Sequence, residues 1–423
     1  MAEPNQIGGN YVIELKINGV DLTKFAHTVR LTNTINSVYP IVTLHIIVEN
    51  TNLILQELFG QYPISMNVTL FGEDGIPKLM TKFMLFDLNS NLNLFPKTQQ
   101  ASTEDHKRQV TMFQCAVLPC FTLMATGVNV AFQEPASLTP LDMLQQGFIQ
   151  AGVSGSFLKF DQRGKNTDLI SQILIPSMTV NKVTDYVHER FGLYNGPLFK
   201  YCNINPTSSQ PELILKDYNQ IMNDAPTIMI YQMPVGGEPG ASDKIIQKCV
   251  DDKHFFTDRS IQTLNYANSS VISNRFKKSQ IIHPEDQLSY TYNYDANSII
   301  EQYSTSESKK LIILDDLKNI ESRQCTGLKG FAYAAPYNQA AMTSRISDQM
   351  KNTFSLGIQL RNNLRINNLM QPGSVCELFP SVIDYSDFAG KYILKSSDIM
   401  FSKIGDNWET KADLVLFRSV RSK

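Results

Sequence analysis

The sequence lacks features that would place it in several common functional classes. No apolar run reaches the ~18 residues that a membrane-spanning helix needs, and the longest, Ile41 to Val48, contains Thr43 and His45. The N-terminus has neither a basic start nor an apolar core, so we expect no signal peptide. Lys and Arg number 38 against 40 Asp and Glu, which excludes nucleic-acid binding by bulk positive charge.

Cysteine is also sparse. The six cysteines stand at positions 115, 120, 202, 249, 325 and 376, and no CxxC pair occurs among them. This spacing excludes a disulfide scaffold in a chain of 423 residues. We therefore expect synthesis in a reducing cytoplasm, with the thiols free and buried.

Charged residues make up only 18% of the chain, below the ~25% that is usual for soluble domains. Hydrophobic residues reach 42%, so the chain has enough apolar side chains to build ordinary cores. The surface must then be rich in neutral polar groups. Such a surface favours large, permanent protein contacts.

What the sequence does contain, at its start, is alternation of apolar and polar residues. Residues 11–17 alternate and are followed by Asn18-Gly19, the strongest two-residue signal for a β-hairpin. A short helix is predicted over 52–59 and an exposed loop over 97–109. Regular short strands of this kind predict an antiparallel barrel or sandwich. Further strands are predicted over 42–48, 64–70, 84–88 and 111–117.

The periodicity changes after Glu134. Thr139-Pro140 predicts a helix start, because Thr can cap a helix and Pro fits its first position. Apolar residues then repeat on one face until Gly152, and a second helix ends at Gly192. The middle of the chain is therefore mixed α and β. Its predicted elements are helices beginning at 140 and over 180–191, and strands over 212–215 and 227–230.

The last part returns to alternation after one more helix. That helix is predicted over 338–351, where Met342, Ile346 and Met350 fall on one face. The turn Gln371-Pro372-Gly373 separates the strands that follow it from the one before. The fold class is α+β, mainly β. The predicted strands of this part span 354–360, 391–396 and 414–418.

Two polar motifs resemble ligand sites only loosely. Gly236-Gly237-Glu238-Pro239-Gly240 lacks the Lys-Ser/Thr of a phosphate-binding loop, and its proline removes an amide donor. Asp87, Asn89 and Asn91 begin like a calcium loop, but position six is Leu92 rather than Gly. We interpret the first as a turn and the second as a strand with polar side chains facing outward.

Two sets of titratable residues are equally weak candidates for a functional site. Asp251, Asp252, His254 and Asp258 have metal-binding side chains, but Lys253 and Arg259 interrupt them, which favours a solvated loop. A nucleophile–base pair would combine Cys115 or Cys120 with His106 or His188, and no known signature supports it. We therefore predict no catalytic, cofactor-binding or metal-binding residue, no cofactor, and no enzymatic activity.

The C-terminal segment carries the most specific pattern. A proline-glycine turn is followed by a valine, then by a glycine-led strand, then by a strand that ends in Phe417-Arg418. This order resembles the last barrel of the baseplate hub subunits of contractile phage tails and of spike carriers in type VI secretion. The segments that carry it are 369–378, 390–397 and 411–418.

Two earlier regions resemble the same hubs. Ile17-Asn18-Gly19 resembles a hairpin near the start of their first barrel, and residues 139–194 resemble their inserted α/β domain. The resemblance implies two antiparallel β-barrel domains with a mixed α/β domain inserted between them. The implied limits are 1–130 for the N-terminal barrel, 131–335 for the middle domain, which can lend strands to the second barrel, and 336–423 for a helix plus the C-terminal barrel.

The resemblance also implies a function. Such hubs are homotrimers that join a six-fold tail tube to a three-fold central spike, and other baseplate proteins surround them. DNA passes through their channel without specific nucleic-acid binding, and no membrane insertion is involved. This implies a virion protein of the tail baseplate, made in the host cytoplasm.

Two alternatives remain open at this point. The chain can be the spike carrier of a type VI or tail-like injection device, which uses the same architecture. From another class, it can be a peptidoglycan hydrolase that uses the Asp/His or Cys/His groups named above. An adhesin of sandwich type fits less well, because the middle region has two predicted helices.

Overall fold

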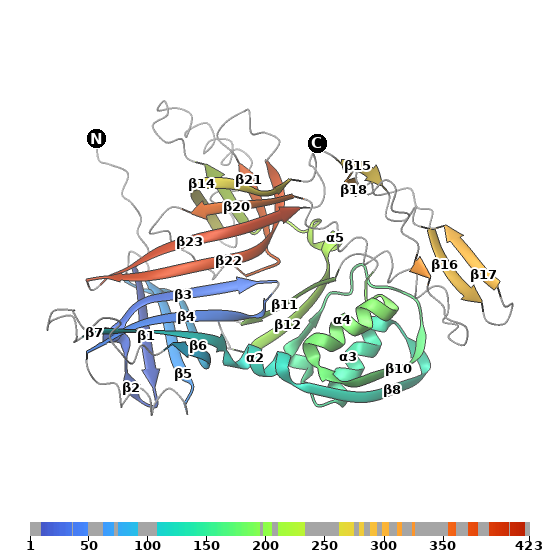
Figure 1. Ribbon diagram of the computed structural model, residues 1–423, viewed down its shortest axis with the longest axis horizontal. Coiled ribbons are helices and arrows are strands. Elements are labelled where there is room, and N and C mark those ends of the chain that lie inside the picture. Colours follow the sequence, from blue (N-terminus) through green and yellow to red (C-terminus); the bar gives the residue numbers. More distant parts are fainter. Residues whose placement is uncertain are drawn as a thin grey trace, which may run out of the picture.

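The protein is mainly β with a few short helices, as the alternating patterns predict (Figure 1). It is represented by a computed structural model. The structure describes residues 10–35, 37–49, 62–71, 75–91, 108–194, 198–204, 210–232, 262–274, 279–282, 288–293, 298–303, 311–314, 324–325, 354–360, 371–379, 389–405 and 407–418.

The N-terminal strands form a closed circuit, called ring 1 here, that borrows two strands from the C-terminal segment. Strand pairing runs β1, β5, β6, β7, β4, β3, β22, β23, and Trp408 of β23 pairs with Tyr11 of β1 to close the circuit. Every pairing in ring 1 is antiparallel. Its strands are β1 (Asn10–Ile17), β3 (Ala26–Thr34), β4 (Ser37–Glu49), β5 (Ile64–Phe71), β6 (Pro77–Asn91), β7 (Arg108–Val117), β22 (Gly390–Ile404) and β23 (Asn407–Arg418).

The alternation in the sequence sets which side chains fill ring 1. Ile13, Leu15 and Ile17 are fully buried, whereas the residues between them face outward. Asn18 and Gly19 both have positive φ, so the predicted hairpin turn is confirmed, and it leads into β2 (Val20–Asp21). A short 3-10 turn, η1 (Thr23–Phe25), connects β2 to β3.

A second closed circuit, ring 2, uses the other half of the same two C-terminal strands. Pairing runs β23, β20, β14, β13, β21, β22, and β22 pairs directly with β23. Ring 2 is not wholly antiparallel, because β13 runs parallel to both β14 and β21. The additional strands are β13 (Ile228–Gln232), β14 (Gln262–Asn274), β20 (Phe354–Leu360) and β21 (Val375–Phe379).

Strands β13 and β14 come from the segment assigned to the middle domain. They lie between 228 and 274, and they pair with β20 and β21 of the C-terminal segment. The limits at 130 and 335 themselves stay a prediction.

The long β22–β23 hairpin belongs to both rings. Residues 390–393 of β22 pair with β21 of ring 2, and residues 396–402 pair with β3 of ring 1. A bulge between Leu394 and Ser396 marks the changeover. In Figure 1 the hairpin runs between the blue ring 1 and the remaining strands of ring 2.

A helical unit is inserted between the two rings in sequence. Helices α3 and α4 cover one face of the antiparallel pair β8–β10, and β9, β12 and β11 form a second small sheet (Figure 1). The elements of the unit are α2 (Leu118–Ala125), β8 (Gly127–Leu138), α3 (Pro140–Gln150), η3 (Gly155–Phe157), β9 (Leu158–Phe160), β10 (Ile170–Thr179), α4 (Val180–Phe191), β11 (Leu198–Ile204), β12 (Pro211–Asp217) and α5 (Tyr218–Ile221).

The predicted helix boundaries in this unit are confirmed. The Thr139 hydroxyl accepts a hydrogen bond from the Asp142 amide at 3.3 Å, and Pro140 occupies the first helical position. Gly152 and Gly192 follow α3 and α4 with positive φ. The helix stripes expected to be apolar are buried, from Leu141 to Val187.

Five further short strands form two small sheets, in which β15 pairs with β18 and β16 pairs with β17 and β19. Three of them occupy the stretch 279–310. The predicted helices over 52–59 and 338–351 lie outside the described residues, as does most of the loop predicted over 97–109, of which residues 108–109 begin β7. The bounds are β15 (Ser279–Ile282), β16 (Leu288–Asn293), β17 (Ser298–Tyr303), β18 (Leu311–Leu314) and β19 (Gln324–Cys325).

Candidate functional site at the junction of ring 2 and the helical unit

An aromatic cluster joins the helical unit to ring 2. The ring of Phe417, on β23, stacks on Phe199 of β11 at 5.9 Å and on Tyr218 of α5 at 5.7 Å between ring centroids. Tyr201 of β11 packs edge-on against Phe199. These rings are almost completely buried, so the helical unit and ring 2 share one piece of core.

A glycine turn fits against this cluster. Gly373 has φ of 81°, and a Cβ atom built on it would lie 2.7 Å from Cε1 of Tyr201. Its amide donates to the Leu394 carbonyl at 2.9 Å, which fixes the turn onto β22. Only glycine therefore satisfies both the backbone conformation and the approach of the tyrosine ring.

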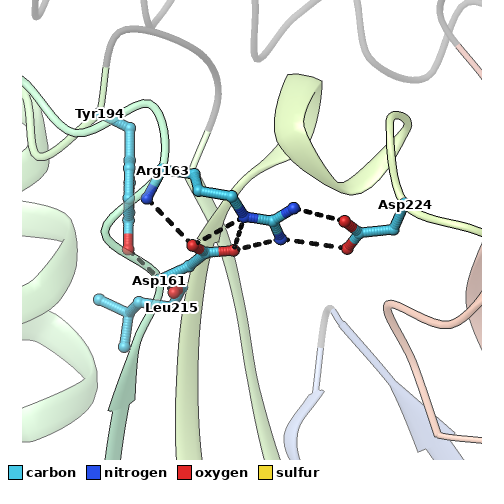
Figure 2. Close-up of polar contacts among 5 residues, drawn as sticks. All are labelled: Asp161, Arg163, Tyr194, Leu215 and Asp224. Atoms are coloured by element: carbon cyan, nitrogen blue, oxygen red, sulfur yellow. Dashed lines mark hydrogen bonds and ion pairs between the residues drawn. The ribbon is translucent and has the colours of Figure 1, made fainter.

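Arg163 forms a clamp with two carboxylates, those of Asp161 and Asp224 (Figure 2). The Arg163 guanidinium donates to Asp161, with Nη2 2.6 Å from Oδ2, and to Asp224, with Nη1 2.5 Å from Oδ1. Partial burial raises the pKa of Asp161, but hydrogen bonds from Arg163 outweigh it, so this pKa lies below its ordinary value. Because the guanidinium binds one carboxylate on each side, a single side chain joins the loop 161–168 to the loop that carries Asp224.

The clamp reaches ring 2 through Asp224. The Lys391 ammonium of β22 donates to the Asp224 carbonyl at 3.1 Å, and the nearby Thr227 amide donates to the Val375 carbonyl at 2.9 Å. On the other side, the Tyr194 hydroxyl donates to the Leu215 carbonyl at 2.9 Å (Figure 2). Burial, followed by the charges of Asp161 and Asp217, raises the pKa of Tyr194, so its hydroxyl stays protonated.

The loop 161–168 extends these contacts into the helices. The Lys165 ammonium donates to Asp142 of α3 at 3.0 Å, and the buried Asn166 amide group donates to the Phe191 carbonyl at the end of α4 at 2.9 Å. Gly164 has φ of 68° and leaves room for the buried Asp217 carboxylate. The loop therefore connects α3, α4 and β12 to the clamp.

A smaller polar contact joins the shared hairpin to ring 1. The Arg30 guanidinium forms a bidentate ion pair with the Asp398 carboxylate of β22, in which Nε lies 2.7 Å from Oδ1. The hydroxyl of Thr32 also donates to Asp398, and the Asn33 side chain donates to Gln371 at 3.0 Å. The contacts with Asp398 hold β3 against the hairpin, and the contact of Asn33 joins β3 to the turn before β21.

The cysteine and histidine candidates from the sequence lie in the core. Cys115 of β7 and Cys120 of α2 are fully buried, and burial followed by the charge of Asp87 raises the pKa of Cys115 to about 12. His188 of α4 is buried, and its Nδ1 accepts a hydrogen bond from the Leu193 amide at 3.2 Å. Both thiols are therefore held protonated at neutral pH, which makes them poor nucleophiles.

The other candidates divide into one strand and several undescribed segments. Asp87, Asn89 and Asn91 all lie on β6, so the predicted strand is confirmed. The prediction that its polar side chains face outward is wrong at Asp87, because Phe86 and Leu88 are 46% and 39% exposed while one carboxylate oxygen of Asp87 is buried. His106, residues 236–240 and residues 251–258 lie outside the described residues. Among the residues that are described, no group of three or more His, Cys, Asp or Glu is placed to hold a metal, and no helix could cross a membrane.

Sequence reasoning missed the clamp. Arg163 and Asp224 are separated by 61 residues, and neither lies in a recognisable motif. The only available signal was the density of Asp and Arg around 161–168 between two apolar elements.

Solved structures of other proteins have a similar architecture. A tail protein from Neisseria meningitidis MC58 superposes with a TM-score of 0.51 at 12% identity, covering 97% of this chain and 97% of that one. A chain of the lidless PdpA–VgrG complex superposes with a TM-score of 0.50 at 9% identity, covering 100% of this chain and 67% of that one. The chain shares their fold.

A 43 kDa tail protein of prophage MuSo2 from Shewanella oneidensis is also similar, with a TM-score of 0.47 at 9% identity, covering 96% of this chain and 98% of that one. No protein-family model matches the chain, and no curated protein matches its sequence. The resemblance to tail hubs and spike carriers drawn from the sequence is thus confirmed at the level of the fold.

Proposed function

We propose that the protein is a non-enzymatic structural subunit of a phage-type tail baseplate. In this proposal it acts as a homotrimeric hub that joins a six-fold tail tube to a three-fold central spike and lines part of the DNA channel. The observation that carries the proposal is the presence of two closed strand rings in one chain, joined by one hairpin. Three such chains would offer six rings to a six-fold partner.

The coupling between the parts supports this role. Both rings share β22 and β23, and the helical unit shares buried aromatic side chains with ring 2. An adaptor between two symmetries needs its two tube-facing parts at a fixed spacing. A shared pair of strands provides that spacing without a flexible linker.

The composition supports permanent assembly. Obligate interfaces often exceed ~2,000 Å², and each charge buried in one costs desolvation energy. A chain with 18% charged residues limits that cost. With a formal net charge of −2, we expect a channel wall that is neutral to acidic and does not retain phosphate.

A second candidate is the spike-carrier subunit of a type VI or tail-like injection device. The likeness to a chain of a PdpA–VgrG complex over 100% of this protein favours keeping it. This candidate predicts the same trimer with a spike attached. A peptidoglycan hydrolase has less support, because the buried cysteines are poor nucleophiles.

Assembly mass tests the proposal. Light scattering coupled to size-exclusion chromatography should give about 143 kDa, three times the 47.7 kDa of the chain. Negative-stain images of this species should show six lobes around a central opening. A monomer at every concentration, or a trimer with three lobes, would contradict the hub.

A matched pair of variants checks that the assembly needs ring 2. Leu356→Asp places a charge at a buried position of β20, whereas Leu174→Asp changes a side chain that is 66% exposed on β10. The first variant should lose the trimer, and the second should retain it.

A further inference from the structure

Two cysteines lie in the core near the point where the chain passes from ring 1 into the helical unit. Cys120 lies on α2, which follows β7 of ring 1 directly, and Cys202 lies on β11. Both side chains are fully buried in the same core. The Cys120 thiol donates a hydrogen bond at 3.7 Å to the carbonyl oxygen of Asn203, the residue next to Cys202, so this sulfur lies against the part of β11 that carries Cys202.

This contact distinguishes the pair from the other buried thiols. Cys115 and Cys376 are equally buried, and what raises their pKa is burial, joined for Cys115 by the Asp87 charge. For Cys120 the first cause of the raised pKa is the hydrogen bond with Cys202, and burial comes second. Cys120 is therefore held as a protonated thiol at neutral pH, which makes it a poor nucleophile.

We propose that Cys120 and Cys202 form a latent disulfide, which closes when the protein meets an oxidising medium and ties α2 covalently to β11. The reaction is thiol–disulfide exchange with a small disulfide. One protein thiolate attacks the small disulfide and releases its first thiol. The second protein thiolate then attacks the mixed disulfide and releases the second thiol, so two electrons and two protons leave the protein.

The bond would act on the coupling between the three parts. Helix α2 is the direct chain connection from ring 1 to the helical unit, and β11 carries Phe199 and Tyr201 into the aromatic cluster of ring 2. A bond between α2 and β11 would therefore stiffen the path from one ring to the other. It would also close a long loop, which lowers the entropy of the unfolded chain. This inference concerns the folded chain alone and is independent of the proposed assembly.

The experiment compares thiols inside one folded protein. The full chain carrying Cys249→Ser and Cys325→Ser retains four cysteines, of which Cys115 and Cys376 serve as internal controls. It is incubated with oxidised glutathione, quenched in acid, and alkylated after unfolding. We expect an intact mass two daltons lower, two alkylated cysteines instead of four, and a proteolytic peptide that links Cys120 to Cys202.

Rate and stability provide further readouts. Closure should accelerate by roughly tenfold per pH unit between pH 7 and 8, because only the thiolate attacks. The oxidised protein should unfold at a higher urea concentration than the reduced one, and dithiothreitol should reverse the change. Cys202→Ser in the same background should form no linked peptide and should show no rise in the midpoint.

Several results would overturn the proposal. Four alkylated thiols after prolonged oxidation of the folded, unsubstituted pair would show that the two sulfurs do not bond. A linked peptide that contains Cys115 or Cys376 would show that oxidation follows unfolding rather than native contact. A disulfide between Cys120 and Cys202 that leaves the urea midpoint unchanged would refute its role in coupling.

Discussion

The turn at Gly373 allows a sharp test of how closely the helical unit is fitted to ring 2. Replacing Gly373 with Ala adds one methyl group, which would lie 2.7 Å from Cε1 and 2.9 Å from Cζ of Tyr201. The tyrosine ring cannot retreat freely, because it is 5% exposed and packs against Phe199. The substitution must therefore displace either the turn or the aromatic cluster.

The magnitude follows from two contributions. A non-glycine residue at φ of 81° costs about 1 kcal/mol, and overpacking a filled core costs about 1–3 kcal/mol more. We therefore expect Gly373→Ala to lower the free energy of unfolding by roughly 2–4 kcal/mol. Gly405→Ala is the matched control, because Gly405 has φ of 63° and no atom within 4 Å of the added methyl group. Gly405→Ala should therefore lower the free energy of unfolding only by the cost of the positive φ, about 1 kcal/mol.

Urea unfolding followed by the fluorescence of Trp408 measures both variants, since Trp408 is the only tryptophan and is buried in β23. A second comparison isolates the contact itself. In a Tyr201→Ala background the methyl group has no ring to meet, so Gly373→Ala should cost no more than Gly405→Ala does. Equal losses for Gly373→Ala and Gly405→Ala in the unsubstituted protein would refute the argument from close approach.

Three further predictions concern the clamp, ring 2 and a helix cap. Arg163→Met should destabilise by about 1 kcal/mol at neutral pH, because the arginine is half exposed, and less in high salt. The pKa of Asp161 is lowered in the folded state from its ordinary value of 3.8, so the stabilisation by its ion pair with Arg163 is complete above pH 3.8 and is lost as the pH falls below that value. In an acid titration followed by circular dichroism, Arg163→Met should therefore lose less stability than the unsubstituted protein does. Leu356→Asp should cost at least ~3 kcal/mol in urea unfolding, whereas exposed Leu174→Asp should change it by less than ~0.5 kcal/mol. Thr139→Ala should cost about 1 kcal/mol, with Thr139→Ser restoring most of it; an unchanged melting temperature for the alanine variant would contradict the cap.

The sequence was most informative about local structure. Alternation identified the buried faces of β1, β4, β5 and β7, because a strand with one apolar face repeats every two residues. Turn and cap residues were equally readable, since Asn18-Gly19 and Thr139-Pro140 act within a few residues of themselves. These features depend on neighbours along the chain.

Strand partners could not be predicted in the same way. Alternation shows that one face of β22 is buried, but not that its first half pairs with β21 and its second half with β3. The sequence likewise did not indicate that β13 runs parallel to β14 and β21, because its apolar run of four residues, 228–231, fits a parallel or an antiparallel strand. Trp408 lies on β23 opposite Tyr11 and is 6% exposed, a pairing that the residues around it in the sequence do not indicate.

The candidate site depended even more on distant contacts. Nothing in the sequence around Phe199 indicates that its ring stacks on Phe417. The Arg163–Asp224 pair joins residues from two loops, and the approach of Gly373 to Tyr201 joins two separate sheets. Contacts of this kind are determined by the closure of the rings, which the sequence pattern does not encode locally.

The shared hairpin has a consequence for dissecting the molecule. Because β22 and β23 complete both circuits, no cut in the chain releases one ring whole and leaves the other intact. A truncation that removes the last two strands opens both circuits at once and exposes four strand edges, on β3, β1, β21 and β20. The molecule is continuous at its centre, and its two halves are inseparable as recombinant fragments.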